Sequence, residues 1–221
     1  MQHASARTLH LFRVYHAGAY HSRPPRFDKR RGVEYKDWNR GEGAKPVMHD
    51  DERLPGIHVL EQTPIIIEKI LHGADDELMS WKPAAERWSI GEVLGHLAEV
   101  EVVGFRDRVQ KMLEAESPQV ESYDQNAAYA SGRYSAKKAR ENLHAFCHER
   151  DRSLSFLRYV PGVAVGRDAV HSTMGRFTVG NIMNEWAFHD LGHIRQIAEL
   201  YRSYAFFPAI GPYQRYYTIH P

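Results

Sequence analysis

The chain has 221 residues, a hydrophobic share of 43% and a formal net charge of +1. This length allows one domain with a full core, and the near-zero charge excludes a whole-chain attraction to nucleic acid or to an anionic membrane. No apolar run approaches the roughly 20 residues of a membrane helix. Because Cys147 is the only cysteine, no intrachain disulfide can form, and we expect a soluble cytoplasmic protein. This lone cysteine is more typical of a small core residue than of a nucleophile.

Residues 1–50 differ in composition from the rest of the chain. They contain RPPRFDKRRG and NRGEGAKP, which are rich in Arg, Lys, Pro and Gly and show neither helical nor strand periodicity. We interpret them as a flexible basic arm of irregular structure. A transit peptide, an upstream start-site overcall and a disordered tail remain alternative explanations. Residues 51–221 are then the folded domain.

The first helical pattern of that domain follows Thr63 and Pro64. This pair is typical of a helix cap and first turn, and it precedes the apolar segment IIIEKILHG. Gly73 is suited to end such a segment because glycine accepts backbone conformations that other residues avoid. The pattern therefore predicts a first helix that begins at Pro64 and ends before Gly73.

Two further helices follow from cap signals and apolar spacing. Ser89 and Glu92 form a capping-box pattern that opens a second helix running to about Glu116. After a long polar connection, Ser135 is a candidate cap for a third helix that ends near Arg158. We expect the connections themselves to lack regular structure.

Thr178 is the candidate cap of a fourth helix, and a loop from Val160 to Phe177 precedes it. With no convincing alternating segment, four amphipathic helices predict an all-α four-helix bundle. The final segment, YRSYAFFPAIGPYQRYYTIHP, is aromatic and interrupted by Pro and Gly. We expect it to form an irregular tail that packs against the bundle.

The fourth helix carries a continuous stripe at spacings of three or four residues: Ile182, Trp186, His189, His193, Ile197 and Leu200. Its two histidines lie about one turn apart, so both rings can point at one volume. A histidine that faces a core must be hydrogen-bonded or be a metal ligand, because unpaired burial costs about 1–3 kcal/mol. Spacing alone leaves a metal site and two satisfied core histidines as alternatives.

His96, near the apolar face of the second helix, is the candidate third ligand. A glycine precedes both His96 and His193, although a mid-helix glycine costs about 1 kcal/mol relative to alanine. Such glycines often mark a close helix approach or a space that is kept open. Three imidazoles from two helices would leave a coordination position for water or substrate. Three neutral ligands also favour an anion, such as hydroxide or thiolate, at that position.

Three carboxylates are placed to orient these rings. Glu92 lies one turn before His96, Glu99 lies three residues after it, and Asp190 adjoins His189. A carboxylate that accepts the outer ring N–H would fix the tautomer and orientation of a metal ligand. For each of the three, a solvated helix charge is the alternative.

Other histidines are less informative. His144 and His148 share the four-residue spacing, but they lie away from the apolar face of the third helix, so we expect them to be solvated. His171, in the loop before the fourth helix, could reach the mouth of the bundle, although a surface position is the simpler interpretation.

The segments WSIGEVLGHLAEVE, FRDRV and HSTMGRFTVGNIMNEWAFHDLGHIRQI resemble the DinB superfamily of bacterial metal-binding four-helix proteins, which includes YfiT-like metal-dependent hydrolases. The resemblance extends from about Asp51 to Tyr201. It implies an up-down-down-up bundle and a homodimer. It also implies that His96, His189 and His193 hold a divalent ion such as zinc, nickel or iron.

The same resemblance implies a reaction. Relatives include transferases that use low-molecular-weight thiols as cosubstrates, so we expect a metal-dependent thiol S-transferase acting on an electrophilic small molecule. A metal-dependent hydrolase and a noncatalytic metal- or ligand-binding bundle are the alternatives. Arg195 stands where iron-containing ergothioneine enzymes have Glu in a HxxxHxE pattern, which argues against that activity. We expect a small-molecule substrate and neither nucleic acid nor membrane as a partner.

Overall fold

A computed structural model describes residues 54–220 of the chain. The predicted arm, residues 1–50, lies outside this range. Within it, the body of the protein consists of four long helical segments, which are α1 (Ile57–Ile70), α3 (Ile90–Val100) with α4 (Asp107–Glu114), α6 (Ala139–Leu157) and α7 (Val179–Ala205). The predicted four-helix bundle is confirmed.

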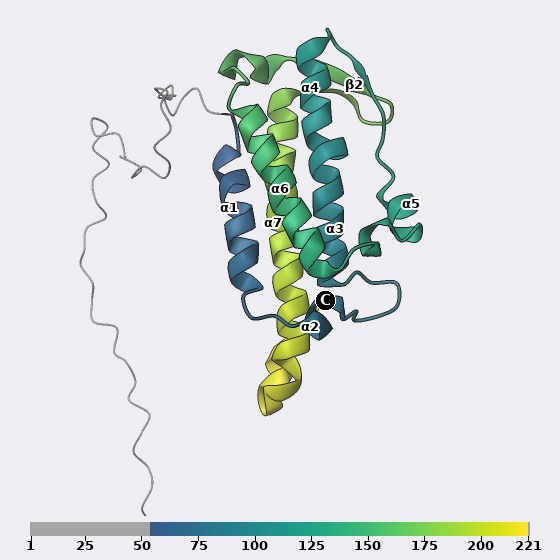
Figure 1. Ribbon diagram of the computed structural model, residues 1–221, viewed down its shortest axis with the longest axis vertical. Coiled ribbons are helices and arrows are strands. Elements are labelled where there is room, and N and C mark those ends of the chain that lie inside the picture. The colour runs from purple at the N-terminus through teal and green to yellow at the C-terminus, as the bar shows by residue number, and fades with distance from the viewer. Residues whose placement is uncertain (1–53, 221) are drawn as a thin grey trace, which may run out of the picture. The chain divides into compact units, whose positions relative to one another are not determined.

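The helices follow the up-down-down-up order (Figure 1). α1 and α7 run in one direction, while α3–α4 and α6 run in the other. α3 packs mainly on α6 and α1 packs mainly on α7, so each close pair is parallel. The long connection between α4 and α6 is therefore necessary, because it carries the chain back to the opposite end of the bundle. It contains β1 (Gln119–Val120) and α5 (Gln125–Ala130).

α1 begins earlier than the sequence predicts. Its first residue is Ile57, after Gly56 in a left-handed conformation, and Pro64 lies inside the helix. A proline cannot donate the hydrogen bond to the carbonyl four residues before it. That carbonyl belongs to Leu60, and the Arg150 side chain donates to it at 2.9 Å instead. The prediction that Pro64 lies in the first turn is therefore wrong, because a side chain of α6 replaces the missing donor.

The predicted capping box at the start of α3 is confirmed. The Ser89 N–H donates to the Glu92 carboxylate at 2.9 Å, and the Glu92 N–H donates to the Ser89 hydroxyl at 3.2 Å. Beyond Val100 the predicted single helix is interrupted by a π-helical turn over Glu101–Arg106, which turns Glu101 and Phe105 into the core. A short helix, α2 (Asp76–Ser80), lies between α1 and α3.

The other predicted caps differ in outcome. Thr178 caps α7, since its hydroxyl accepts from the Asn181 N–H at 3.1 Å. Ser135 does not cap α6. It ends a 3-10 turn over Arg133–Ser135, and α6 begins four residues later, where the Glu141 carboxylate accepts from the Lys138 N–H at 3.0 Å.

The segment predicted as a loop before α7 contains a hairpin. β2 (Asp168–His171) pairs antiparallel with β3 (Gly175–Thr178), and β1 adds a parallel edge to β2. These strands of two to four residues are too short to give a clear alternating pattern. The sheet lies at the end of the bundle where α4 ends and α7 begins (Figure 1).

The core contains two apolar clusters along the bundle. One includes Phe105 and Trp186, and the other includes Leu94, Leu97 and Ile197. On α7, His189 and His193 lie between Trp186 of the first cluster and Ile197 of the second, so a polar layer separates the two apolar regions of the bundle.

Beyond α7 the chain forms two 3-10 turns, Phe207–Ala209 and Gly211–Tyr216. The tail contacts the bundle through the His220 N–H, which donates to Glu199 at 2.8 Å. Tyr213 and Tyr216 contribute little to this packing, because both are 66% exposed, whereas the Phe206 ring stacks on Tyr201 of α7 with centroids 5.8 Å apart. In residues 54–220, no helix is both long enough and apolar enough to cross a membrane.

Candidate metal centre

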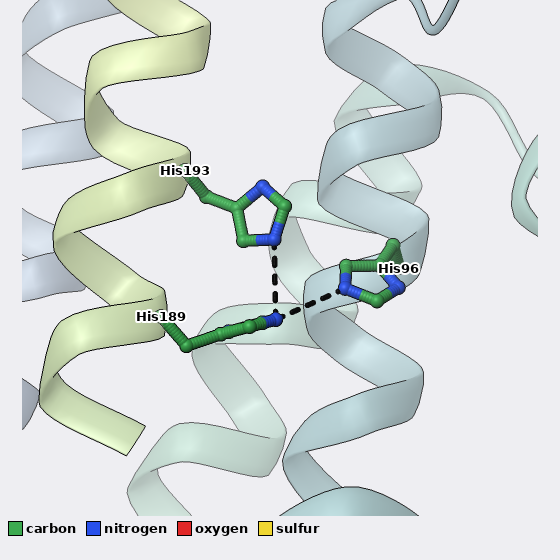
Figure 2. Close-up of side chains that lie close together, drawn as sticks. All are labelled: His96, His189 and His193. Atoms are coloured by element: carbon green, nitrogen blue, oxygen red, sulfur yellow. Dashed lines mark hydrogen bonds between the residues drawn. The ribbon is translucent and has the colours of Figure 1, made fainter. Parts of the chain in front are cut away.

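The three histidines singled out in the sequence meet between α3 and α7 (Figure 2). The Nε2 atom of His189 lies 3.1 Å from Nε2 of His96 and 3.2 Å from Nε2 of His193. Each ring thus turns the same nitrogen towards a common centre. Among residues 54–220, these three are the group of His, Cys, Asp or Glu side chains whose ligand atoms come close enough to hold an ion.

The site favours neutral imidazoles. Burial, followed by the positive charge of a protonated His193, lowers the pKa of His96 from 6.5 to about 3. Burial, followed by the neighbouring histidines and Arg150, lowers the pKa of His189 to about 2. Burial also lowers the pKa of His193. Neutral rings at physiological pH have lone pairs available, which is the form in which histidine binds metals.

The outer ring nitrogens have different surroundings. Nδ1 of His96 lies 3.1 Å from the Tyr134 hydroxyl, and Nδ1 of His193 lies 2.9 Å from the Gln196 side-chain oxygen. Nδ1 of His189 is buried and has no hydrogen-bond partner among the described residues. Two of the three rings are therefore fixed by a second contact.

None of the three predicted carboxylates takes such a position directly. Glu92 is committed to the α3 capping box and to an ion pair with Lys82 at 2.6 Å. Asp190 faces Arg150 at 2.6 Å, and Glu99 pairs with Arg133 at 2.5 Å. The expectation of a direct carboxylate contact at His96 is wrong, because the Tyr134 hydroxyl fills that place.

A cavity of about 560 Å³ opens beside the histidines. His189 and His193 form part of its wall, so the cavity gives access to one side of the three-histidine cluster. The rings of Trp88 and Phe105 pack on other sides, with centroids 5.1 Å from His96 and 5.3 Å from His189. The cluster is thus covered by aromatic rings and open towards the cavity.

A sequence model of the DinB superfamily matches residues 60–197. The chain belongs to the DinB superfamily. Uncharacterized protein YuaE of Bacillus subtilis (strain 168) is 28% identical over 143 residues, which cover 59% of this chain and 87% of YuaE. The solved structure of YfiT from Bacillus subtilis, described as a probable metal-dependent hydrolase with an unusual four-helix bundle topology, matches with a TM-score of 0.59 and 23% identity. The match covers 67% of this chain and 85% of YfiT, and it shows a shared fold.

In this DinB superfamily member, a buried ion cluster supports the helix that carries His189. The Arg150 guanidinium is fully buried and lies between Glu101 at 2.8 Å and Asp190 at 2.6 Å. The Trp186 indole N–H also donates to Glu101 at 3.0 Å. Because Arg150 also binds the Leu60 carbonyl, one side chain of α6 joins α1, the π-helical turn and α7 next to the candidate metal centre.

The two glycines beside the histidines have different roles. A Cβ atom at Gly95 would lie 2.5 Å from the Tyr134 carbonyl oxygen, so Gly95 allows close packing of α3 against the 3-10 turn. A Cβ atom at Gly192 would meet no atom within 4 Å, and Gly192 lines the cavity. Gly192 therefore leaves open space where the cavity meets α7.

Other predicted positions lie away from this centre. His144 and His148 are exposed, as expected. His171 is buried, contrary to the surface interpretation, and its Nδ1 accepts from the Thr173 N–H at 3.1 Å within the hairpin turn. Burial is the main cause that raises the pKa of the half-buried Cys147 thiol to about 11, which does not favour a nucleophilic thiolate at neutral pH.

The sequence analysis assigned no role to several residues around the centre, which are Trp88, Tyr123, Tyr134, Arg150 and Gln196. Tyr134 is 38 positions from His96 and lies in the long connection, where no periodicity constrains it. Two of them had a signal that could have been used: Trp88 directly precedes the Ser89 cap, and Gln196 follows His193 by three residues, so helical spacing places it on the same face.

Proposed function

We propose that His96, His189 and His193 hold one divalent metal ion through their Nε2 atoms. Two nitrogens that share an ion at about 2.0–2.1 Å lie about 3 Å apart for coordination angles of roughly 90–110°. The observed separations of 3.1 and 3.2 Å agree with that requirement. Zinc, nickel and iron all accept imidazole ligands, and ligand type alone does not choose between them.

The number of ring N–H groups and lone pairs at the three histidines favours a bound cation. Nδ1 of His193 donates to Gln196, so Nε2 of His193 has a free lone pair. If Nδ1 of His96 donates to Tyr134 in the same way, two free lone pairs face Nε2 of His189. A neutral His189 has one N–H and could satisfy only one of them. With its hydrogen on Nδ1, His189 would offer a third lone pair from Nε2, and a cation at the common centre would satisfy all three.

We propose that the protein is a metal-dependent hydrolase. A bound divalent ion would supply a Lewis acid that makes water a sufficient nucleophile at neutral pH. The observation that carries this proposal is the convergence of three neutral imidazoles at the wall of a cavity of about 560 Å³, a volume suited to a small molecule. The description of YfiT as a probable metal-dependent hydrolase supports the same reaction class.

The chain's own residues would hold the metal centre and direct the substrate towards it. The three histidines fix the centre between two helices, and the rings of Trp88 and Phe105 limit the approach of water from the bundle interior. Substrate would enter through the cavity. Three neutral ligands leave the charge of a dication uncompensated, so an anionic group or a polarised carbonyl would be favoured there.

Thiol transfer is the second candidate. The observation that favours it is the composition of the cavity wall, which includes Arg87 and Arg195. Neither side chain forms an ion pair with a described residue, whereas Arg202 is paired with Glu199. The two guanidiniums would suit a carboxylate, such as one carried by a low-molecular-weight thiol. A noncatalytic metal-binding bundle is the remaining alternative.

The test is a turnover assay on protein loaded with zinc, nickel or iron, using a panel of carboxylic esters, amides and phosphate esters. The hydrolase proposal predicts product formation without added thiol, and chelation should abolish it. Turnover that requires an added thiol would instead support transfer. His148→Ala is the control for an exposed histidine and should keep wild-type turnover, whereas His193→Ala should lose it.

A further inference from the structure

A chain of hydrogen bonds leads from His96 through Tyr134 to Tyr123, whose hydroxyl is influenced by a nearby carboxylate. Nδ1 of His96 lies 3.1 Å from the Tyr134 hydroxyl, which lies 2.7 Å from the Tyr123 hydroxyl. Burial, the hydrogen bond with Tyr134 and then the negative charge of Glu99 raise the pKa of Tyr123, so the Glu99 carboxylate acts on this hydroxyl. Glu99 was expected to orient His96 directly, but in the structure two tyrosines stand between them.

The direction of these bonds follows from the groups at the ends. The Glu99 carboxylate can only accept, and its negative charge favours an orientation in which the Tyr123 hydroxyl hydrogen points towards it. Tyr123 has one hydroxyl hydrogen and can then only accept from Tyr134. The Tyr134 hydrogen is used in that bond, so its oxygen can only accept from Nδ1–H of His96. The sequence of donors thus places the hydrogen of His96 on Nδ1 and leaves Nε2 free.

The tyrosine nearest to His96 is held rigidly. Tyr134 is 1% exposed, and its ring packs edge-on against His96 and Trp88 with centroids 5.3 and 5.2 Å away. Its carbonyl accepts from the Asn142 side chain at 2.8 Å, and that side chain also donates to the Gly91 carbonyl at 2.9 Å. A hydroxyl on such a fixed ring has little freedom to leave its partner.

We propose that Tyr134 is a positioning residue for His96, which keeps the hydrogen on Nδ1 and presents the Nε2 lone pair to the metal. Tyr123 and Glu99 set the direction of its hydroxyl. This inference rests on the proposed metal site, because the Nδ1–H tautomer of His96 serves metal binding only if Nε2 is a ligand. Partners of this kind outside the ligand shell typically change metal affinity by 10–100-fold when they are removed.

The test compares Tyr134→Phe with Tyr129→Phe. The first variant removes the hydroxyl and keeps the ring. Tyr129 is a matched control, because its ring also packs on Trp88, with centroids 5.4 Å apart, while its hydroxyl contacts Lys82 and the Arg87 carbonyl rather than a histidine. Side-chain nitrogen NMR of metal-free protein reports the tautomer of His96, and zinc titration reports the dissociation constant.

We expect wild type and Tyr129→Phe to show the Nδ1–H tautomer at His96 with equal zinc affinity. Tyr134→Phe should lose that tautomer preference, and its zinc dissociation constant should rise about 10–100-fold. An Nε2–H tautomer in the wild type, or an unchanged tautomer and affinity in Tyr134→Phe, would overturn the proposal.

Tyr123→Phe gives a second, independent variant if Tyr134→Phe does not fold. It removes the acceptor at 2.7 Å that directs the Tyr134 hydroxyl, so it should also weaken the Nδ1–H preference, and an unchanged preference would count against the relay. If the wild type binds no zinc, the proposed function fails, while the tautomers in the metal-free proteins still decide whether Tyr134 directs His96.

Discussion

The Nε2 atoms of His96 and His189 lie 3.1 Å apart, although the two residues are separated by 93 positions in the chain. The contact depends on the packing of α3 against α7. His193, one turn further along α7, brings a third nitrogen within 3.2 Å of His189. The same three residues form the conspicuous histidine pattern in the sequence, and the fold brings that pattern to one point beside a cavity.

Acidification should destabilise the metal-free protein. The pKa values of His96 and His189 are about 3 and 2 in the folded state, below the ordinary value of 6.5. As pH falls below 6.5, the unfolded chain binds protons that the folded chain excludes, so stability is lost as pH falls towards the folded pKa values. Each group adds a slope of up to about 1.4 kcal/mol per pH unit.

Urea unfolding between about pH 7 and pH 5 measures this slope. His96→Gln should show a shallower pH dependence than the wild type, because one excluded proton is removed. His148→Gln, a change at an exposed histidine, should retain the wild-type slope. Equal slopes for wild type and His96→Gln would contradict the assignment of a neutral buried ring.

Much of the fold could be predicted from local signals. The caps at Ser89 and Thr178 are short-range hydrogen-bond patterns, and both are present in the structure. The start of α1 could not be predicted, because Pro64 remains inside the helix only where Arg150 replaces the missing donor to Leu60. That contact spans 90 positions, and no local pattern contains it.

The candidate site could likewise be predicted only where local helical spacing determines it. The α7 stripe placed His189 and His193 on one inward face, because helical spacing is a local property. The partners of the rings come from elsewhere, since Tyr134 lies in a connection without periodicity. The carboxylates near the histidines in sequence were misassigned for a physical reason, because Glu92 and Asp190 are already paired with Lys82 and Arg150.

Removal of Arg150 should be severely destabilising. Arg150→Met would leave Glu101 and Asp190 buried without their shared cation, which typically costs about 3–5 kcal/mol. Arg152→Met is the matched control, because Arg152 lies two residues away, its side chain is 60% exposed and, among residues 54–220, it pairs only with Glu149. Exposed pairs contribute at most about 1 kcal/mol. Denaturant midpoints measure both variants, and similar losses of stability would contradict the role of Arg150.

The same substitution should have opposite effects at the two glycines beside the histidines. Gly192→Ala should stabilise the protein by up to about 1 kcal/mol, since the added Cβ meets no atom within 4 Å and alanine favours the helix. Gly95→Ala should destabilise it, because the Cβ would lie 2.5 Å from the Tyr134 carbonyl oxygen. Urea unfolding reports both changes. A stabilising effect at Gly95 would show that α3 does not pack as closely as the structure indicates.

A larger side chain at Gly192 should block substrate access and leave metal binding intact, so it tests whether the two are independent. Gly192→Phe would place a ring at the cavity wall, at a position where an added Cβ meets no atom within 4 Å. We expect metal content to remain at the wild-type level while turnover of any substrate found in the hydrolase assay falls. Loss of metal in this variant, with the helical content intact, would show that the cavity and the metal centre are not separable.

The most direct test of the central claim is elemental analysis by mass spectrometry on protein purified without an affinity tag or added metal. Wild type should contain about one equivalent of a divalent transition metal, and His96→Ala and His193→Ala should lose most of it while keeping their helical circular dichroism. His144→Ala, an exposed member of a pair with the same spacing, should retain the metal. Full retention in His96→Ala, or no metal in the wild type even after reconstitution with zinc, nickel and iron, would contradict the three-histidine site.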